Sequence, residues 1–577
     1  MAVMADSEER AEGERVAPWL RRAILAVLAL AFLGSGLYQA AHEAPTVDEG
    51  VDVSSGIVTV VRHDLRMTPE HPPLAKVPAA VGALIGRPIV PITRAYRDGR
   101  WFDYSDDFIS ANEAAGRLRH VLFWARAVAL LEGLGCAALL YVLARRVFGP
   151  DGGLLVAGAW LTTPYTVGLS HFAMIDVPFT LITLACCVGL AWWRDAPSVR
   201  RAAVVGLLLG LALATRHTGL VLVLVAVGVM VAARWGRPRD AVREVVLAGL
   251  VAMITLWAVY RGLAPAGPSG AVAARFDAII ASASNGSAVS RLVTAMPMPK
   301  EWRAGFAYLD LTGTNRPASL FGQSWDGGRW WFFPASAFLK IPLTLTVAVV
   351  AGWVLALRRG ARRPVDRRQL VAVVIAPALA LWLFLLAQPL NLGLRLAMPV
   401  VALALVGLGG LATLRWSGRR WAALIVPLAL LQLLASGVAT PHSLAWTPPP
   451  WSPAYRWVSD ANLDAGQALY EVRSWARSHD RPFVAIDTTR GMSVKGGSRS
   501  LLDVDPSAVR GWVAVGVTPL MQTEREELAW LRKYCPVATL GGGSVLIYRF
   551  EDAPTATPGP ERPVPPCIGD EVSTDRS

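Results

Sequence analysis

The sequence predicts an all-α polytopic membrane protein with about eleven transmembrane helices, followed by a small extracytoplasmic α/β domain at the C-terminus. Hydrophobic residues make up 54% of the 577-residue chain. Charged residues make up only 17%, against about 25% in typical soluble domains. The apolar residues are gathered in long runs that short arginine clusters separate. A soluble core would not concentrate its apolar residues in this way.

The apolar runs define the predicted spans. A helix needs about 20 apolar residues to cross a hydrocarbon core of roughly 30 Å. The first run is too long for a cleaved signal peptide and is expected to be a retained span. The fifth and sixth runs are short and meet at residues 215–218, so one long bent helix is the competing interpretation there. The predicted spans cover residues 22–41, 121–144, 152–171, 177–193, 202–216, 218–233, 244–260, 332–357, 369–388, 396–414 and 421–439.

The arginine clusters predict the orientation. With the N-terminus in the cytoplasm, every predicted inner loop is basic, as the positive-inside rule requires. Membrane topology therefore explains the net charge of +13, and no nucleic-acid partner is expected. The clusters are Arg21/Arg22, Arg145/Arg146, Arg194/Arg200/Arg201, Arg234/Arg237/Arg239, Arg358/Arg359/Arg362/Arg363, Arg367/Arg368 and Arg415/Arg419/Arg420.

The domain organisation follows from these spans. Residues 1–18 are expected to be a disordered cytoplasmic N-terminus, and residues 19–440 the transmembrane domain with outer loops 42–120 and 261–331. Residues 441–552 are expected to form the extracytoplasmic α/β domain, ahead of a disordered tail at 553–577. Cys535 and Cys567 could form a disulfide, and the sequence leaves this open. Within the domain, periodicity predicts a helix at 465–478 and strands at 483–487, 511–517 and 544–550.

The first outer loop is unusually polar close to the bilayer. Asp48 and Glu49 follow the first span directly, and residues 70–76 (EHPPLAK) place His71 and Lys76 beside two stiffening prolines. Carboxylates in an outer loop are most often merely solvated. Their position next to the membrane, with a histidine and a lysine in the same loop, favours a functional site instead.

These residues resemble the first outer loop of polyprenyl-phosphate-dependent glycosyltransferases with the GT-C fold, a family that includes protein O-mannosyltransferases and lipid A aminoarabinose transferases. The sequence departs from the family pattern at Arg216, where the family usually has lysine, and at Ile341 and Ala465. Further similar stretches follow in the family's order at residues 175–178 (IDVP), 214–216 (ATR), 328–334 with 339–342, 391–395 (NLGLR) with Pro399, and 459–467 (SDANLDAGQ).

The resemblance implies the GT-C fold and a role for each acidic residue. Asp48 is the expected general base that takes the acceptor's proton, and the single displacement inverts the anomeric carbon. Glu49 is expected to orient the acceptor or the neighbouring loop. Asp176 is expected to position the donor or the acceptor.

Four further residues are expected to bind the carrier phosphate. Lys76 and Arg216 are the first candidates, with Arg395 and His71 after them. Arginine in place of lysine at 216 keeps the positive charge but favours bidentate phosphate binding. An ion pair between Arg216 and Asp176 is the alternative.

The predicted function is therefore transfer of a sugar from a polyprenyl-phosphate donor to a protein, lipid or glycan acceptor by a multi-pass enzyme of the cell membrane. No metal or other cofactor is expected to be obligatory, because the histidines lack the H-x-x-H spacing of many metal sites; a divalent ion among them remains an alternative. A transporter or flippase of lipid-linked sugars, or a non-catalytic scaffold, are the competing functions. The composition suggests a bacterial cell envelope, and the sugar, the acceptor, the oligomeric state and the role of the C-terminal domain stay open.

Overall fold

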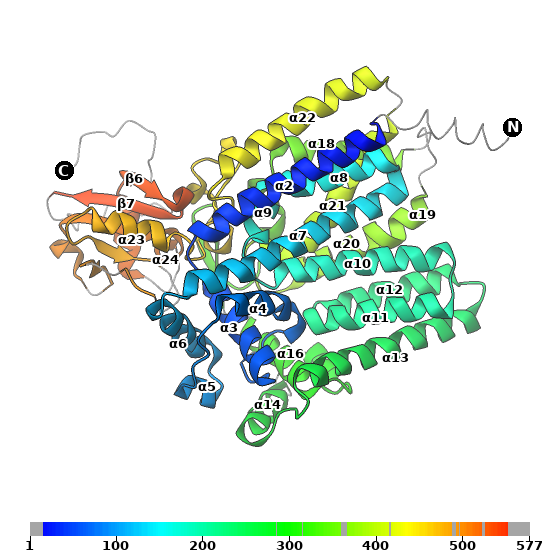
Figure 1. The fold of residues 1–577 in the computed structure, drawn as a ribbon, viewed down its shortest axis with the longest axis horizontal. Coiled ribbons are helices and arrows are strands. Elements are labelled where there is room, and N and C mark those ends of the chain that lie inside the picture. The colour runs from blue at the N-terminus through cyan, green and yellow to red at the C-terminus, as the bar shows by residue number, and fades with distance from the viewer. Residues whose placement is uncertain are drawn as a thin grey trace.

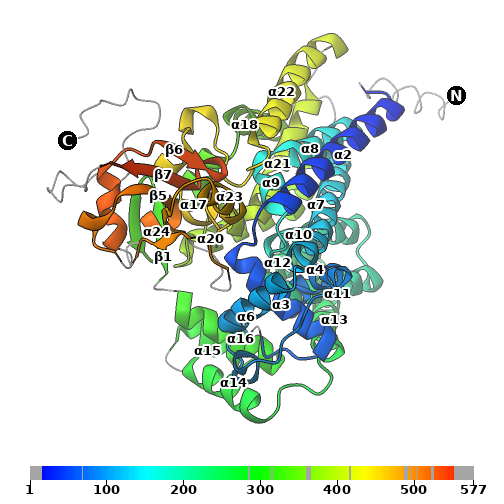
Figure 2. The ribbon, with the colours of Figure 1, turned by 60° about the vertical axis from the view of Figure 1, so that its left-hand side comes forward.

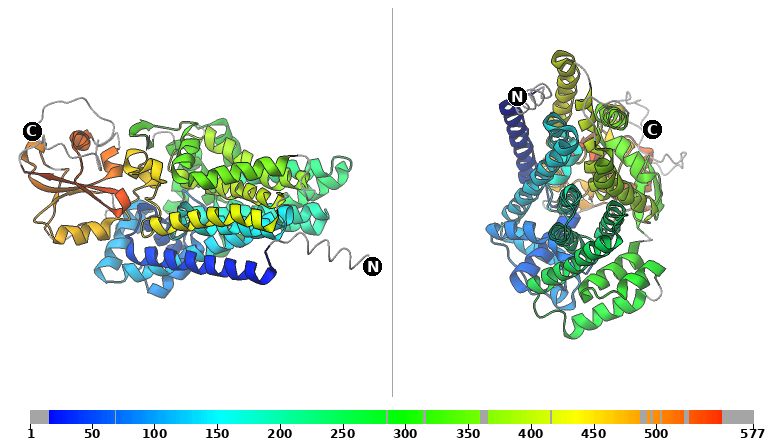
Figure 3. Two further views of the ribbon diagram at one scale, coloured as in Figure 1. Left: turned by 90° about the horizontal axis from the view of Figure 1, so that it is seen from above. Right: turned by 90° about the vertical axis from the view of Figure 1, so that its right-hand side faces the viewer.

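A bundle of long helices carries a small domain at one end in the computed structural model (Figure 1). The helices run side by side, and the C-terminal domain lies at the end away from the N-terminus (Figures 1 and 3). The structure describes residues 16–551 except 68, 284–285, 314–315, 359–365, 415–416, 487–491, 495–496, 503 and 522–525. The predicted terminal segments 1–18 and 553–577 therefore lie almost wholly outside the described residues.

Each predicted apolar run coincides with a helical segment. Their bounds are α2(Pro18–His42), α7(Leu118–Phe148), α8(Pro150–Thr162), α9(Pro164–Ser170), α10(Asp176–Asp195), α11(Val199–Thr215), α12(Gly219–Ala233), α13(Pro238–Leu263), α17(Phe332–Lys340), α18(Leu343–Leu357), α19(Arg367–Leu370), the π-helical η5(Val371–Ile375), α20(Ala376–Ala387), η6(Leu394–Ala397), α21(Met398–Leu405), η7(Val406–Thr413) and α22(Gly418–Ala439).

The number of spans depends on how the shorter and bent segments are counted. Within the described ranges, seven helices are long and apolar enough to cross a bilayer, and eight if α17 and α18, bent by 114°, form one span. The third predicted run is broken at Pro164 into α8 and α9, since proline cannot continue the hydrogen-bond ladder. The predicted fold class, a helical membrane bundle with a small α/β domain, is confirmed, while the count of eleven stays a prediction.

The fifth and sixth runs form a helical hairpin and not one bent helix. Residues 216–218 separate α11 from α12. A Cβ added to Gly219 would lie 2.8 Å from the backbone of Ala212, so the chain turns back on itself there. Gly206 and Gly210, four residues apart on α11, likewise let this helix approach the backbone of α13 at Ala248 and Ala252.

The arginine clusters gather at one end of the bundle, which we call the basic end. Arg21 at the start of α2 pairs with Asp151 at the start of α8, with 3.0 Å between Nη1 and Oδ1. Arg146 at the end of α7 pairs with Asp195 at the end of α10, also at 3.0 Å. Alternation of the helices places the other described clusters at the same end (Figure 1). The distribution agrees with the charge pattern that predicts this end to be cytoplasmic.

The two outer loops are largely helical and pack together at the opposite end (Figure 2). Arg275 of the second loop donates a hydrogen bond to the carbonyl of Asp98 in the first at 3.1 Å, and Trp101 contacts Tyr308 edge to face. The first loop holds α3(Val47–Arg62), η1(Pro73–Ala75), α4(Val77–Ala83), η2(Leu84–Gly86), α5(Arg94–Asp98) and α6(Trp101–Ala114). The second holds α14(Gly270–Ser282), α15(Ala288–Thr294), α16(Lys300–Thr312) and the hairpin β1(Pro317–Leu320)–β2(Gln323–Asp326).

The C-terminal domain is built on a mixed sheet. The described strands lie in the order β4-β3-β5-β7-β6, with β3 parallel to β4 and β5, and β7 antiparallel to β5 and β6. The predicted helix and three strands are confirmed as α23, β3, β5 and β7. The elements are η8(Pro449–Trp451), η9(Ala454–Arg456), η10(Asp460–Asn462), α23(Leu469–Arg477), β3(Phe483–Ala485), β4(Arg499–Ser500), η11(Pro506–Ala508), β5(Gly511–Gly516), α24(Val517–Met521), η12(Glu526–Lys533), β6(Ala538–Leu540), η13(Gly541–Gly543) and β7(Val545–Phe550).

The cysteines divide between the two parts of the protein. Cys136, Cys186 and Cys187 are free and buried in the bundle. Cys535 in the C-terminal domain is disulfide-bonded. Cys567, the partner that the sequence leaves open, lies outside the described residues.

Candidate active site

The helix α3 presents two carboxylates on one face at the end of the bundle opposite the basic end, which we call the site end. Thr46 caps the helix: its Oγ1 accepts a hydrogen bond from the Glu49 amide at 3.2 Å, and the Glu49 carboxylate accepts one from the Thr46 amide at 3.0 Å. Asp48 lies in the first turn and Asp52 one turn later. Because residues four apart share a helix face, both carboxylates point to the same side of α3.

Glu49 does not face the same site, because a buried arginine holds it. Arg126 of α7 donates Nε to Oε1 at 2.8 Å and Nη2 to Oε2 at 2.7 Å. The Glu49 carboxylate also accepts a hydrogen bond from the Ala173 amide at 2.9 Å. The remaining Arg126 donors reach the carbonyls of Ala40, Glu43 and Ala44, so one guanidinium fixes the whole turn from α2 into α3. Of the two roles expected for Glu49, these contacts correspond to orienting the loop.

This contact also sets the charge of Glu49. Burial raises the pKa of Glu49, but the Arg126 guanidinium and the two backbone donors outweigh it and hold the pKa below its usual range. Glu49 is therefore ionised beside the permanently charged Arg126. We call this interaction the Arg126–Glu49 clamp.

Lys76 of the first loop pairs with Asp52. Its Nζ lies 3.3 Å from Asp52 Oδ1, and both side chains are nearly inaccessible. The chain around Lys76 can approach α3 this closely because Gly56 has no side chain: an added Cβ would lie 2.8 Å from the Lys76 carbonyl oxygen. Asp52 was not among the residues expected from the sequence.

Burial shifts the proton affinities of this pair. It raises the pKa of Asp52 to about 7; Lys76 opposes this, while Asp48 and Asp176 add to it. Burial also lowers the pKa of Lys76, although Asp52, Glu70 and Asp48 counteract part of the effect. Asp52 is therefore a carboxyl group that gains or loses its proton near neutral pH.

Asp176 and Arg216 form the second pair. Asp176 is the first residue of α10, and Arg216 follows the last residue of α11. Arg216 Nη1 donates to Asp176 Oδ1 at 2.8 Å, and only 12% of the Arg216 side chain is exposed. The alternative role for Arg216, an ion pair with Asp176, is thus present in the structure. Binding of a phosphate would have to compete with this pair.

Arg395 and Asp48 form the third pair. Arg395 Nη1 donates to Asp48 Oδ2 across 347 residues of sequence. The Arg395 segment is positioned by Asn462, whose side-chain oxygen accepts from the Leu394 amide at 2.8 Å, and by Gly393 in a left-handed conformation with φ 72°. The Asp48 side chain is 42% exposed, by far the most accessible of the three carboxylates.

His71 lies among cations and stays neutral. Burial and the neighbouring Lys76 and Arg216 lower the pKa of His71 well below its usual value. Its Nδ1 atom is buried without a hydrogen-bond partner among the described residues. Beside it, Glu70 pairs with Arg316 of the second loop at 3.1 Å between Oε1 and Nη2.

The structure thus brings together five predicted residues, Asp48, Asp176, Lys76, Arg216 and Arg395, which form three ion pairs with Asp52 as the sixth member. It places His71 beside them and sets Glu49 apart in the clamp. The pairs are linked electrostatically: Asp176 acts on both Asp52 and Arg395. Sequence reasoning missed Asp52, Glu70 and Arg316. Only Asp52 had a sequence signal, its spacing of four from Asp48.

Two further histidines of this end, His171 and His442, form a separate network. His171 Nε2 lies 2.7 Å from Glu43 Oε2, and His442 contacts Glu43 at 3.4 Å and Glu471 at 3.5 Å. Across the part of the chain that the structure describes, no group of three or more His, Cys, Asp or Glu side chains could hold a metal ion. The network instead links the end of α2 to the C-terminal domain.

Comparison with known proteins adds a family match. A family model of dolichyl-phosphate-mannose-protein mannosyltransferases matches residues 117–261, which include Asp176 and Arg216. The match confirms the resemblance that the motifs predicted. No curated protein sequence matches the chain significantly.

Two solved structures are among those to which the chain is similar. ArnT from Cupriavidus metallidurans bound to undecaprenyl phosphate is 18% identical, with 76% of this chain and 68% of that chain covered and a TM-score of 0.45. The Archaeoglobus fulgidus oligosaccharyltransferase in the apo form is 11% identical, with 91% and 74% covered and a TM-score of 0.45.

Removing the clamp should destabilise the site end. Arg126→Met leaves the buried Glu49 carboxylate without its cation, and breaking a buried pair costs about 3–5 kcal/mol. We expect a clearly lower melting temperature for the detergent-purified variant. Arg146→Met is the matched control, because its pair with Asp195 is partly exposed and worth about 0–1 kcal/mol. Equal melting temperatures for the two variants would contradict the role of the clamp.

Proposed function

We propose that this chain is a membrane glycosyltransferase that transfers a sugar from a polyprenyl-phosphate donor to an extracytoplasmic acceptor. The observation that carries the proposal is the set of three carboxylate–cation pairs at the site end: Asp48 with Arg395, Asp52 with Lys76, and Asp176 with Arg216. The family match over residues 117–261, to proteins named for a dolichyl-phosphate mannose donor, supports the choice of donor.

The three cations suit a lipid phosphate at the bilayer surface. Breaking the bond between the sugar and the phosphate leaves negative charge on the leaving group, so fixed cations around it lower the barrier. Lys76, Arg216 and Arg395 provide that charge, and the two arginines can each offer two donors to phosphate oxygens. His71, neutral and with a free ring nitrogen among the described residues, lies beside Lys76 and Arg216 and is assigned to orient the phosphate.

Phosphate binding also prepares the base. In the unliganded protein Arg395 neutralises Asp48. When the carrier phosphate draws Arg395 to itself, Asp48 loses its counter-ion and is free to accept the proton of an acceptor hydroxyl. Because Asp48 is the exposed carboxylate of the three, it is the one that an acceptor hydroxyl can reach. The hydroxyl oxygen attacks the anomeric carbon as its proton passes to Asp48 and the polyprenyl phosphate leaves. This single displacement inverts the configuration.

The remaining acidic residues support this step. Asp176 holds Arg216 at the junction of α10 and α11 and so positions the phosphate site. Glu49 acts through the clamp and keeps α3 in place. The arginine pattern assigns the basic end to the cytoplasm and the site end to the outer surface. No step in this scheme needs a metal ion.

Asp48→Asn should abolish transfer while leaving carrier binding intact. The amide keeps the shape of the carboxylate but cannot accept the proton, and loss of a general base costs about 10²–10⁴-fold in rate. The measurement is turnover of a radiolabelled undecaprenyl-phosphate sugar, with binding of undecaprenyl phosphate measured in parallel. Asp103→Asn on α6, where the carboxylate pairs with exposed Arg100, is the control. An Asp48→Asn variant with wild-type turnover would exclude Asp48 as the base.

Lys76→Ala and Arg216→Ala should each weaken undecaprenyl phosphate binding. A hydrogen bond to a charged group is worth about 1.5–3 kcal/mol, which corresponds to roughly 10–100-fold in affinity. Titration of the detergent-purified variants with undecaprenyl phosphate measures this directly. Arg94→Ala, with its side chain 88% exposed on α5, should bind as the wild type does. Unchanged affinity in both site variants would refute the phosphate assignment.

Asp52 predicts a pH dependence of carrier binding. Since burial raises the pKa of Asp52 to about 7, the group is protonated below neutral pH and releases Lys76 for the phosphate. As pH rises through 7, ionised Asp52 competes for Lys76 and affinity falls. The phosphate also titrates, but it does so equally in every variant, so the pH profile of the wild type is compared with that of Asp52→Asn. At pH 8 the Asp52→Asn variant should bind the carrier more tightly than the wild type, and it should lack the fall in affinity that Asp52 causes. Parallel pH profiles for wild type and variant would contradict the prediction.

A further inference from the structure

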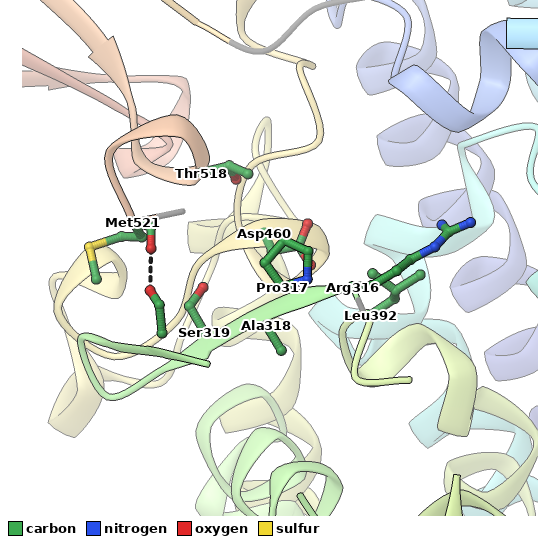
Figure 4. A pocket seen from close by; sticks show the side chains of 9 residues that line it. Arg316, Pro317, Ala318, Ser319, Leu392, Asp460, Thr518 and Met521 are labelled. Carbon is green, nitrogen blue, oxygen red and sulfur yellow. Dashed lines mark hydrogen bonds between the residues drawn. The ribbon is translucent and has the colours of Figure 1, made fainter. Parts of the chain in front are cut away.

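A pocket lies between the bundle and the C-terminal domain, next to the candidate active site. Its volume is about 170 Å³. One wall comes from Thr518 and Met521 of α24, and the hairpin β1–β2 contributes Ser319 to the floor (Figure 4). Leu392 lines the pocket on the side of the bundle, and Asp460 of η10 completes the lining. The pocket is therefore complete only when the C-terminal domain is in place.

Two chains of contacts join the pocket to the ion pairs. Leu392 lines the pocket, and its carbonyl accepts a hydrogen bond from Arg395 Nε at 3.4 Å, while the same guanidinium holds Asp48. Arg316 also lines the pocket, and its guanidinium extends away from Thr518 and Met521 to pair with Glu70 (Figure 4). The pocket is thus linked to the Asp48 carboxylate through the Leu392 backbone and the Arg395 side chain.

The lining is hydroxyl-rich and close to neutral. Ser319, Ser324 and Thr518 supply hydroxyl groups, each of which already makes a hydrogen bond and keeps further capacity to accept. The Asp460 carboxylate adds an acceptor and acts electrostatically on Arg395. Pro317, Ala318, Leu392 and Met521 provide apolar surface between these groups.

The volume limits what fits. A water molecule occupies about 30 Å³ of liquid, so the pocket holds the equivalent of roughly five or six waters. That is room for one small ring. Alternating hydroxyl and apolar surface matches an uncharged sugar ring, which presents hydroxyl groups at its edge and C–H groups on its faces.

Asp460 has a constrained backbone at this wall. Its φ is 52°, in the left-handed region that residues other than glycine seldom adopt. Aspartate and asparagine tolerate this conformation better than most side chains. Asp460→Asn therefore removes the carboxylate charge and keeps the backbone, which makes it a clean test of the wall.

We infer that this pocket binds one uncharged monosaccharide unit of the acceptor, and that the C-terminal domain serves to complete it. This inference rests on the proposed glycosyltransferase function and names its acceptor class: a saccharide, held near the Asp48–Arg395 pair by residues from both parts of the protein. It gives α24 and the hairpin β1–β2 a role in acceptor binding that is separate from carrier binding.

The test measures binding of methyl glycosides of mannose, glucose, galactose and arabinose to the full-length detergent-purified protein. Saturation-transfer NMR detects the binding. We expect at least one glycoside to bind the wild type. Asp460→Asn and the pocket-filling Leu392→Trp should each weaken that binding at least tenfold while undecaprenyl phosphate affinity stays within twofold of the wild type. Arg549→Gln on β7, with its side chain 55% exposed, is the control in the same domain.

The outcomes separate the two proposals. Failure of the wild type to bind undecaprenyl phosphate counts against the proposed function itself. Binding of undecaprenyl phosphate without any glycoside, or glycoside binding that neither pocket variant changes, overturns the pocket assignment alone. Binding of a short serine-containing peptide in place of every glycoside, with loss in the same two variants, overturns the saccharide class. If Leu392→Trp loses binding of both carrier and glycoside, the Asp460→Asn variant decides the pocket assignment: unchanged glycoside binding in that variant overturns it.

Discussion

The clamp between Arg126 and Glu49 is the interaction on which the rest of the site depends. One buried guanidinium gathers a carboxylate from the first turn of α3 and three carbonyls from the end of α2. Charged groups are buried only when their hydrogen-bonding partners are supplied, and here every partner of the guanidinium lies between Ala40 and Glu49. The direction in which α3 leaves the bundle follows from this contact. Asp48 and Asp52 then face the cations because they lie on one side of that helix.

A site assembled from ion pairs can exchange partners. Each cation at the site end already has a carboxylate within reach, so the unliganded protein avoids an unpaired buried charge. An incoming phosphate adds negative charge and competes for the same donors. The pairs also come from distant segments: α3 contributes two acids, while the cations belong to the first loop, the α11–α12 turn and the start of η6. Breaking one ion pair therefore changes the contacts of two elements that are far apart in sequence.

The helical bundle could be predicted because its signal is local. Runs of about 20 apolar residues mark spans without reference to the rest of the chain. The break at Pro164 and the hairpin at residues 216–218 were harder, since both depend on how neighbouring helices pack. The helical character of the first loop had one sequence signal, the capping box from Thr46 to Glu49.

The site was predictable in its residues and not in its pairings. Motifs nominated Asp48, Lys76, Asp176, Arg216 and Arg395, and all five lie at the site end. No sequence pattern couples Asp48 to a residue 347 positions away, because only the fold brings η6 against α3. Arg126 carried no signal at all, because it is a single arginine near the start of the apolar run 121–144. Its burial against Glu49 is a product of packing.

The most direct test is the position of the carrier lipid itself. A structure of the protein in a lipid nanodisc with undecaprenyl phosphate should place the phosphate in contact with Lys76, Arg216 and Arg395, with the Asp48–Arg395 pair broken. The lipid chain would then extend from the site end along the membrane-spanning helices. A phosphate bound at the basic end, or one bound with all three ion pairs intact, would contradict the account.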